Sequence, residues 1–103
     1  MKPANYGPFY AAGLYPKIAE VCRWHGYALA VHGSLANDFD LIAVPWGVEV
    51  SEPSEVVAEL VNTFAFERDI PEPTTMPHGR VAYTIPFSFA ECRMDLSFTP
   101  RTP

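Results

Sequence analysis

Apolar residues recur every three to four positions in two stretches of the chain, which is the period of a helix buried on one side. The first stretch covers residues 14–25 and is followed by Gly26, a residue suited to the left-handed end of a helix. The second covers residues 52–66, and Ser51 just before it is the expected N-cap. The inward stripes comprise Ile18, Val21, Cys22 and His25 in the first helix and Val56, Val57, Leu60, Val61 and Phe64 in the second.

Four other stretches carry strand patterns. Residues 27–31 and 39–46 are largely apolar, as in strands covered by helices, whereas residues 80–87 and 91–98 alternate apolar and polar side chains. The first two strands are joined by residues 32–38, too few for the crossover that parallel neighbours need, so we expect them to pair antiparallel. The last two strands, with a short connection between them, predict a hairpin.

The final strand indicates how the sheet is covered. Its apolar side chains, Cys92, Met94, Leu96 and Phe98, alternate with Glu91, Arg93, Asp95 and Ser97. One face of the sheet is therefore expected to be core and the other polar and open. The sequence predicts a single domain over residues 1–103 of the α+β (α/β) class: a small mixed, largely antiparallel sheet with helices on one face, in the order α-β-β-α-β-β. Residues 1–13 are expected to form a docked N-terminal arm with a helical turn at 9–12, residues 67–79 a loop, and residues 99–103 a tail.

Composition and charge narrow the function classes. The 49% hydrophobic content is that of a globular domain, and the net charge of −5, with seven Lys and Arg scattered along the chain, argues against duplex nucleic acid as a partner. No apolar run has the roughly 18 residues needed to span a bilayer, and no signal peptide precedes the domain, so we expect no membrane association. Cys22 and Cys92 fall in a helix and a strand, which predicts reduced core thiols and a cytoplasmic protein. Trp24 and Trp46 are expected to pack in the core or at its rim.

Carboxylates gather at the start of the second strand. Asp38 and Asp40 alternate, which places both on one face about 6.5–7 Å apart. Asp95 is a third carboxylate, on the polar face of the last strand, where we expect Arg93 to form an ion pair with it. Neighbouring acids raise one another's pKa, and Mg²⁺ or Mn²⁺ relieves that repulsion through oxygen ligands. The three acids are therefore candidate metal ligands and catalytic residues, the alternative being that the first two only cap a turn.

Other residues near these acids can hold a phosphate. Gly33 lets a phosphate approach the backbone closely, and the Ser34 hydroxyl can bond to its oxygens. His32 is a candidate donor at the rim of the site, although a histidine at a strand end is also a common structural residue. Arg80 can supply the positive charge that a transferring phosphoryl group requires, or it is an ordinary solvated residue at a strand start.

The order of these residues resembles a known family. Gly33-Ser34, then Asp38-Phe39-Asp40-Leu41, then a helix, then Met94-Asp95-Leu96 is similar to the signature of the nucleotidyltransferase superfamily with the DNA polymerase beta-like fold, and the resemblance runs from Tyr27 to Phe98. It implies that Asp38 and Asp40 bind two catalytic Mg²⁺ or Mn²⁺ ions. It further implies that Asp95 assists one ion and activates the attacking hydroxyl, while Ser34 holds the terminal phosphates of the nucleotide. In size the chain resembles small nucleotidyltransferase-like proteins of bacteria and their phages.

The resemblance implies a metal-dependent enzyme that transfers a nucleoside monophosphate from an NTP to a hydroxyl of a protein or small molecule. Only three residues separate Ser34 from Asp38, a shorter connection than the family pattern has. This favours the alternative of a catalytically silent nucleotide-binding or protein-interaction module, an antitoxin-like or phage regulator that keeps the fold and acts through a second copy or another protein. A metal-dependent phosphohydrolase is less favoured, because the sequence offers no histidine cluster.

Overall fold

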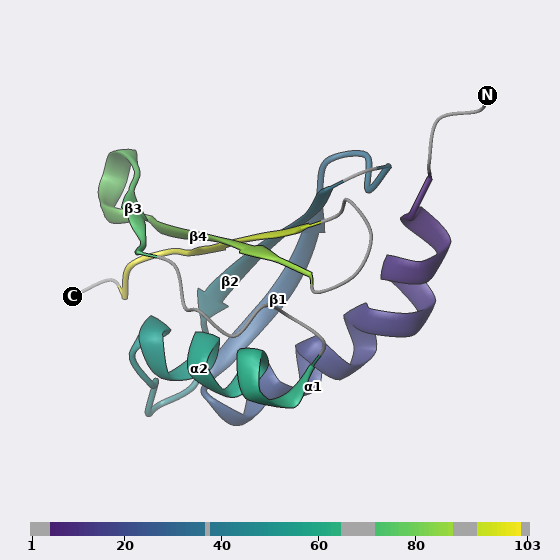
Figure 1. Cartoon of the computed structure of the whole chain (residues 1–103). Coiled ribbons are helices and arrows are strands. Elements are labelled where there is room, and N and C mark those ends of the chain that lie inside the picture. Colours follow the sequence, from purple (N-terminus) through teal and green to yellow (C-terminus); the bar gives the residue numbers. More distant parts are fainter. Residues whose placement is uncertain (1–4, 37, 65–71, 88–92, 102–103) are drawn as a thin grey trace.

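A mixed five-stranded sheet forms the centre of the molecule (Figure 1). The structure is a computed structural model that describes residues 5–36, 38–64, 72–87 and 93–101. The strands, in spatial order, are β1 (Tyr27–His32), β2 (Asp38–Pro45), β5 (Arg93–Phe98), β4 (Val81–Pro86) and β3 (Thr74–Thr75). All neighbouring strands are antiparallel except β2 and β5, which run parallel. The predicted antiparallel pairing of the first two strands, and the mixed character of the sheet, are confirmed.

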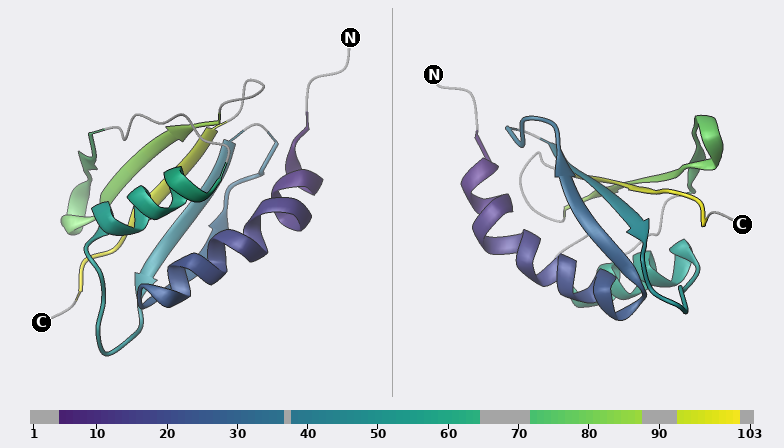
Figure 2. Two further views of the ribbon diagram at one scale, coloured as in Figure 1. Left: turned by 60° about the horizontal axis from the view of Figure 1, so that its bottom comes forward. Right: turned by 180° about the vertical axis from the view of Figure 1, so that it is seen from behind.

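Two helices cover one face of the sheet, as expected (Figures 1 and 2). They are α1 (Tyr15–Trp24), which continues from a π-helical segment (Phe9–Leu14), and α2 (Pro53–Thr63). Each helix has a proline in its first turn, a position that tolerates proline because the missing N–H has no partner there. The element order is α-β-β-α-β-β-β, so the short strand β3 is added to the predicted order.

The start of α2 differs from the prediction. The N-cap is Glu52 instead of Ser51, and no side chain caps the helix. The Ser51 hydroxyl lies 2.8 Å from Nδ1 of His25, whose Nε2 lies 2.7 Å from Glu59 on α2. Ser51 therefore connects the end of α1 to the loop before α2 through His25.

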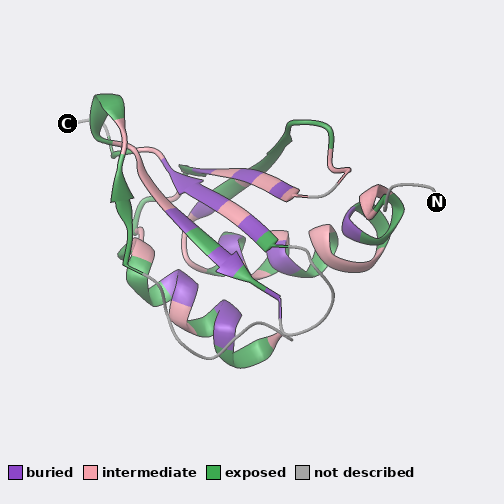
Figure 3. Cartoon of the chain, turned by 45° about the horizontal axis from the view of Figure 1, so that its top comes forward, coloured by how far each residue is buried: buried purple, intermediate pink, exposed green. Residues whose placement is uncertain are grey.

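The core lies between the two helices and the covered face of the sheet (Figure 3). Phe39 and Leu41 on β2 are fully buried there, and the π-helical segment contributes Tyr10, whose ring stacks on Phe39 at a centroid distance of 4.7 Å. This contact docks the N-terminal segment on the sheet. Each large apolar side chain buried in this way contributes roughly 1.5–3 kcal/mol to folding. The fully buried side chains of this core include Tyr10, Phe39, Ile18, Leu41, Leu60, Ile85, Met94, Leu96, Val56, Val57 and Cys22.

The prediction that both tryptophans pack in the core or at its rim is wrong. Trp24 and Trp46 are 82% and 83% exposed and pack neither in the core nor against its rim. Ser97 alternates with the buried Leu96 and Phe98 and so lies on the open face as expected, but it is only 8% exposed there.

The stretch expected to be a loop at 67–79 contains short regular elements where the structure describes it. Thr74 and Thr75 form β3, which pairs with Ala82 and Val81 of β4, and a 3₁₀ turn covers Pro77–Gly79. So short a strand in a proline-rich stretch cannot be recognised from the sequence, because two residues give no periodicity to detect.

Cys22 is fully buried and free, as predicted, and burial followed by the charge of Glu59 raises the pKa of its thiol to about 12. The prediction for Cys92 and the connection of the hairpin at 88–90 lie outside the described residues. Across the described chain, neither helix has the length and apolar character that crossing a membrane would require.

Candidate functional site

Four side chains line up across one end of the face that the helices leave open. Asp40 on β2 lies in register with His32 on β1 and with Asp95 on β5, and Thr84 on β4 lies in register with Asp95. We call these four residues the acid row. Residues on either side of Asp40 along β2 are fully buried, so Asp40 points away from the core. The predicted placement of Asp95 on the same face as the β2 acids is therefore confirmed.

The carboxyl groups of Asp40 and Asp95 lie side by side, because the two residues are in register on the parallel strands β2 and β5. Burial is the main cause that raises the pKa of Asp40 above its ordinary value, and the charge and hydrogen bond of Asp95 raise it further, with a smaller contribution from Asp38. The charge of His32 acts in the opposite direction. The acid row thus places a second carboxyl group beside Asp40, whose charged form is disfavoured by burial.

Gly33 connects the end of β1 to this pair. It has φ of +79°, and a Cβ added there would lie 2.6 Å from Oδ2 of Asp40. The backbone conformation therefore favours glycine, and an added Cβ would also force the carboxyl group of Asp40 to shift. Ser34 is exposed beside it, and its Oγ accepts a hydrogen bond of 3.4 Å from the backbone N–H of Ala36. Of the predicted Gly-Ser pair, Gly33 lies against Asp40, the acid in register with Asp95.

Asp38 is in a different situation one step along the sheet. It lies in register with Arg93, which in turn is in register with Pro86, and we call these three residues the ion-pair row. Nε of Arg93 lies 3.4 Å from Oδ1 of Asp38. The expected ion pair of Arg93 with Asp95 is wrong, because the parallel register of β2 and β5 brings Arg93 opposite Asp38 instead.

The acid pair is suited to binding one hard divalent cation rather than two. Asp40 and Asp95 offer adjacent carboxylate oxygens, and a cation between them would offset their negative charges. Asp38 would have to leave Arg93 to join them. In the described part of the chain, no group of three or more His, Cys, Asp and Glu side chains is arranged to hold a metal ion.

Arg80 is not brought to the acids. It immediately precedes β4, four residues from Thr84, which corresponds to roughly 13 Å along a strand. It therefore lies toward the opposite end of the sheet from the acid row.

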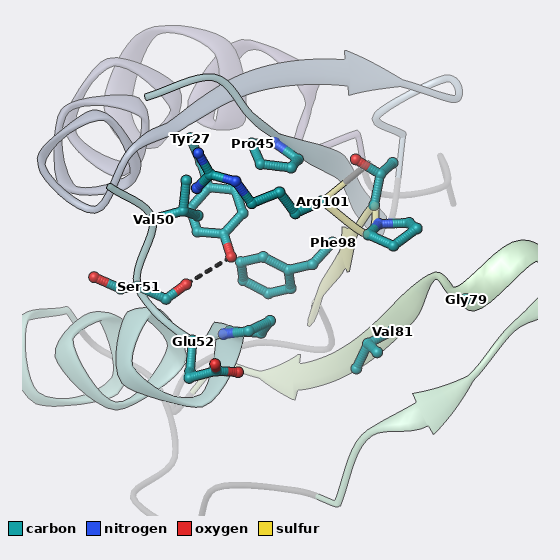
Figure 4. Close-up of a pocket in the computed structure, with 12 residues that line it drawn as sticks. Tyr27, Pro45, Val50, Ser51, Glu52, Gly79, Val81, Phe98 and Arg101 are labelled. Atoms are coloured by element: carbon teal, nitrogen blue, oxygen red, sulfur yellow. Dashed lines mark hydrogen bonds between the residues drawn. The ribbon is translucent and has the colours of Figure 1, made fainter. Parts of the chain in front are cut away.

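That opposite end holds a pocket of about 250 Å³, which sequence reasoning missed (Figure 4). The hydroxyl of Tyr27 donates a 2.7 Å hydrogen bond to the carbonyl of Ser51, and Glu52 and Arg101 lie on either side of it. Burial, followed by the charge of Glu52, raises the pKa of Tyr27, and Arg101 acts against this shift. A sequence signal did exist: Pro45, Pro53 and Pro100 mark two strand ends and a helix start, and these ends meet at the pocket.

The fold defines a small α+β protein with two helices and a five-stranded mixed sheet. Comparison of the chain with family models, curated proteins and solved structures gives no match. The arguments for function therefore come from this chain's own residues.

Proposed function

We propose that this chain is a minimal nucleotidyltransferase-like domain that binds Mg²⁺ or Mn²⁺ and an NTP at the acid row. The reaction would transfer a nucleoside monophosphate to a hydroxyl of a protein or small molecule. The observation that supports it is the pair formed by Asp40 and Asp95, held in register on neighbouring parallel strands beside the Gly33 turn. A like-charged pair weakens the folded state unless a ligand compensates it, so its presence on an open face indicates a binding role.

Several residues at this end of the sheet have separate roles in the proposal. Asp40 and Asp95 would hold the cation, which when bound supplies positive charge to neutralise the phosphates. Gly33 lets the phosphates approach the backbone, and the exposed hydroxyl of Ser34 can donate to their oxygens. His32, exposed at the end of the same row, can donate to a phosphate from the β1 side. Asp38 would bind the cation only after its ion pair with Arg93 is broken.

One observation favours the alternative, a catalytically silent module that keeps the fold. Arg93 already neutralises Asp38, one of the two acids that would bind metal in an active member of the family. The short turn between Gly33 and Asp38 also contains no helix among its described residues, so no helix N-terminus is available there for a triphosphate. In this alternative the acid row binds a nucleotide or a cation without chemistry. In either case the free, buried thiol of Cys22 is in keeping with a reducing cytoplasm.

The test uses the substitution Asp40→Asn with Glu55→Gln as a matched control, because Glu55 is an exposed acid on α2 outside the acid row. Melting curves with and without Mn²⁺ are recorded beside a labelled-NTP transfer assay. Wild type and Glu55→Gln should gain about 2.7 kcal/mol when Mn²⁺ is at a hundredfold excess over its dissociation constant, and Asp40→Asn should gain far less.

The two functions give different results in this experiment. A Mn²⁺ response that depends on Asp40, together with label transfer, supports the enzyme. The same response without transfer supports the silent module. Equal Mn²⁺ responses in all three proteins would overturn the cation site itself.

A further inference from the structure

Strand β1 lies at the outer edge of the sheet, and the structure describes no strand beyond it. Backbone groups of an antiparallel strand alternate between its two sides. The carbonyl of Gly26 accepts the N–H of Trp46 at 2.8 Å, so Ala28, Ala30 and His32 also turn their backbone groups toward β2. The N–H and C=O groups of Tyr27, Leu29 and Val31 therefore point away from the sheet.

The hydroxyl of Tyr15 confirms this direction, since it donates a 2.6 Å hydrogen bond to the carbonyl of Leu29. It occupies one of the six outward backbone groups of the edge. Natural proteins protect such edges with proline, lysine, bulges or short length. The sequence of β1, YALAVH, has six residues with no proline and no lysine, whereas the opposite edge strand, β3, has only two residues.

A groove of about 390 Å³ runs along this unprotected edge. One wall is α1, which contributes Tyr15, Ala19 and Arg23 at four-residue spacing and thus from one side of the helix. The other wall includes Trp46, which lies in register with Gly26 and so meets no opposing side chain on β1. The backbone edge of β1 thus lies between one side of α1 and the exposed indole of Trp46.

We propose that this groove binds an extended peptide segment of a partner protein, which adds a strand to β1 and places a carboxylate against Arg23. Backbone groups of the edge would bond to the segment, and its side chains would alternate between the small Ala19 and the indole of Trp46. The charge preference comes from Arg23, whose exposed guanidinium has no ion-pair partner among the described residues.

A second copy of the chain fits this edge less well. A two-fold pairing of β1 with itself centred on Leu29 would use the Leu29 carbonyl of both copies. Each of these carbonyls already accepts one hydrogen bond from Tyr15. A peptide of another protein loses only one such bond.

The experiment selects a random nonapeptide library, displayed on phage, against the full chain. Trp46→Ala and Trp24→Ala serve as matched variants, because both tryptophans are equally exposed but only Trp46 lines the groove. Selected peptides should alternate branched or aromatic residues with polar ones and carry an acidic residue. Their enrichment should fall at least tenfold on Trp46→Ala and stay unchanged on Trp24→Ala. Arg23→Glu should reverse the charge preference of the selected peptides.

Amide exchange of the chain locates the binding. A selected peptide should slow exchange of the N–H groups of Tyr27, Leu29 and Val31 at least tenfold. No enrichment over Trp46→Ala, or protection elsewhere than β1, would overturn the proposal. So would doubling of the chain's mass in sedimentation equilibrium with protection of the same amides, since the edge would then bind a second copy.

Discussion

The acid row and the ion-pair row are adjacent on the same two strands, but their charges are arranged in opposite ways. In the ion-pair row, β2 presents Asp38 and β5 presents Arg93, so the charges neutralise each other at the surface. In the acid row, two residues further along, the same strands present Asp40 and Asp95, two carboxyl groups side by side, and the charge of Asp95 adds to burial in raising the pKa of Asp40. The charges of the ion-pair row are neutralised within the chain, whereas the charges of the acid row are compensated only by protonation or by a ligand.

This difference indicates which acid to assign to function. An exposed ion pair contributes between nothing and about 1 kcal/mol, so Asp38 and Arg93 need no explanation beyond solubility and register. A like-charged pair reduces stability in the absence of a ligand. The acid row therefore carries the argument for a binding site, and the four predictions that follow test the contrast between the two rows.

The largest effect is expected for Gly33→Ala, which disturbs the acid row through the turn that covers it. The new Cβ would lie 2.6 Å from Oδ2 of Asp40, at a φ of +79° that alanine adopts with strain. The free energy of unfolding should fall by about 2 kcal/mol, measured by urea denaturation.

Gly79→Ala is the matched control for this change. Gly79 has φ of +78°, but its added Cβ would meet only Pro100 at 3.4 Å, an ordinary contact. It should therefore show the strain of the backbone without the contact. Equal losses in the two variants would mean that Gly33 is required only for its conformation and not for its approach to Asp40.

The contrast between the two rows was only partly visible in the sequence. Alternation along a strand is a local property, and it correctly placed Asp38 with Asp40 and buried Met94 and Leu96 opposite Asp95. Register between β2 and β5 is not local, because helix α2 and strands β3 and β4 lie between them in the chain. A shift of two residues would keep every face assignment and yet exchange the partners of Asp38 and Asp40. The sequence therefore predicted three acids on one face but not which of them form the pair.

Exposure of the tryptophans and the position of Arg80 could not be predicted for a related reason. Trp46 follows the end of β2 and lies opposite Gly26, so no side chain next to β1 faces it. This arrangement depends on the register between β1 and β2. Arg80 immediately precedes β4, at the end of the sheet where Phe98 pairs with Val81, and the antiparallel direction of β4 and β5 takes it away from Asp95. Hydrophobicity and charge identify such residues, but three-dimensional pairing decides their neighbours.

The second prediction concerns a substitution that introduces an ion pair into the acid row. Asp95→Lys places a positive charge beside Asp40 and should raise the free energy of unfolding of the metal-free protein by about 1 kcal/mol. It should also abolish stabilisation by Mn²⁺, because only one carboxylate remains in the pair. Asp95→Asn, which removes the charge without reversing it, should give a smaller gain and the same loss of Mn²⁺ response. Lower stability of both variants in urea denaturation would show that the pair is stabilising as it stands.

The third prediction concerns pH. The folded-state pKa of Asp40 is raised above its ordinary value of 3.8, so the folded chain holds a proton that the unfolded chain releases between those two values. This contribution to stability is fully present below the ordinary pKa and is lost as pH rises through the raised one. Relative to wild type, Asp40→Asn should therefore become more stable as pH increases through that window, measured as urea midpoints between about pH 3.5 and 7. A difference that does not change with pH would contradict the raised pKa, and Glu55→Gln is the control for a general charge effect.

The smallest effect on stability is expected from Arg93→Gln, which removes the cation of the ion-pair row. Both side chains of this ion pair are exposed by more than a third, so the free energy of unfolding should change by less than about 0.5 kcal/mol. The informative measurement is the affinity for Mn²⁺, followed by the shift in melting temperature over a Mn²⁺ titration. Without Arg93, Asp38 is free to join Asp40 and Asp95 around a cation, so Mn²⁺ should bind more tightly than in wild type. An affinity that stays constant would place Asp38 outside the site and favour a single cation held by the acid row, whereas weaker binding would mean that Arg93 itself helps to organise the acids.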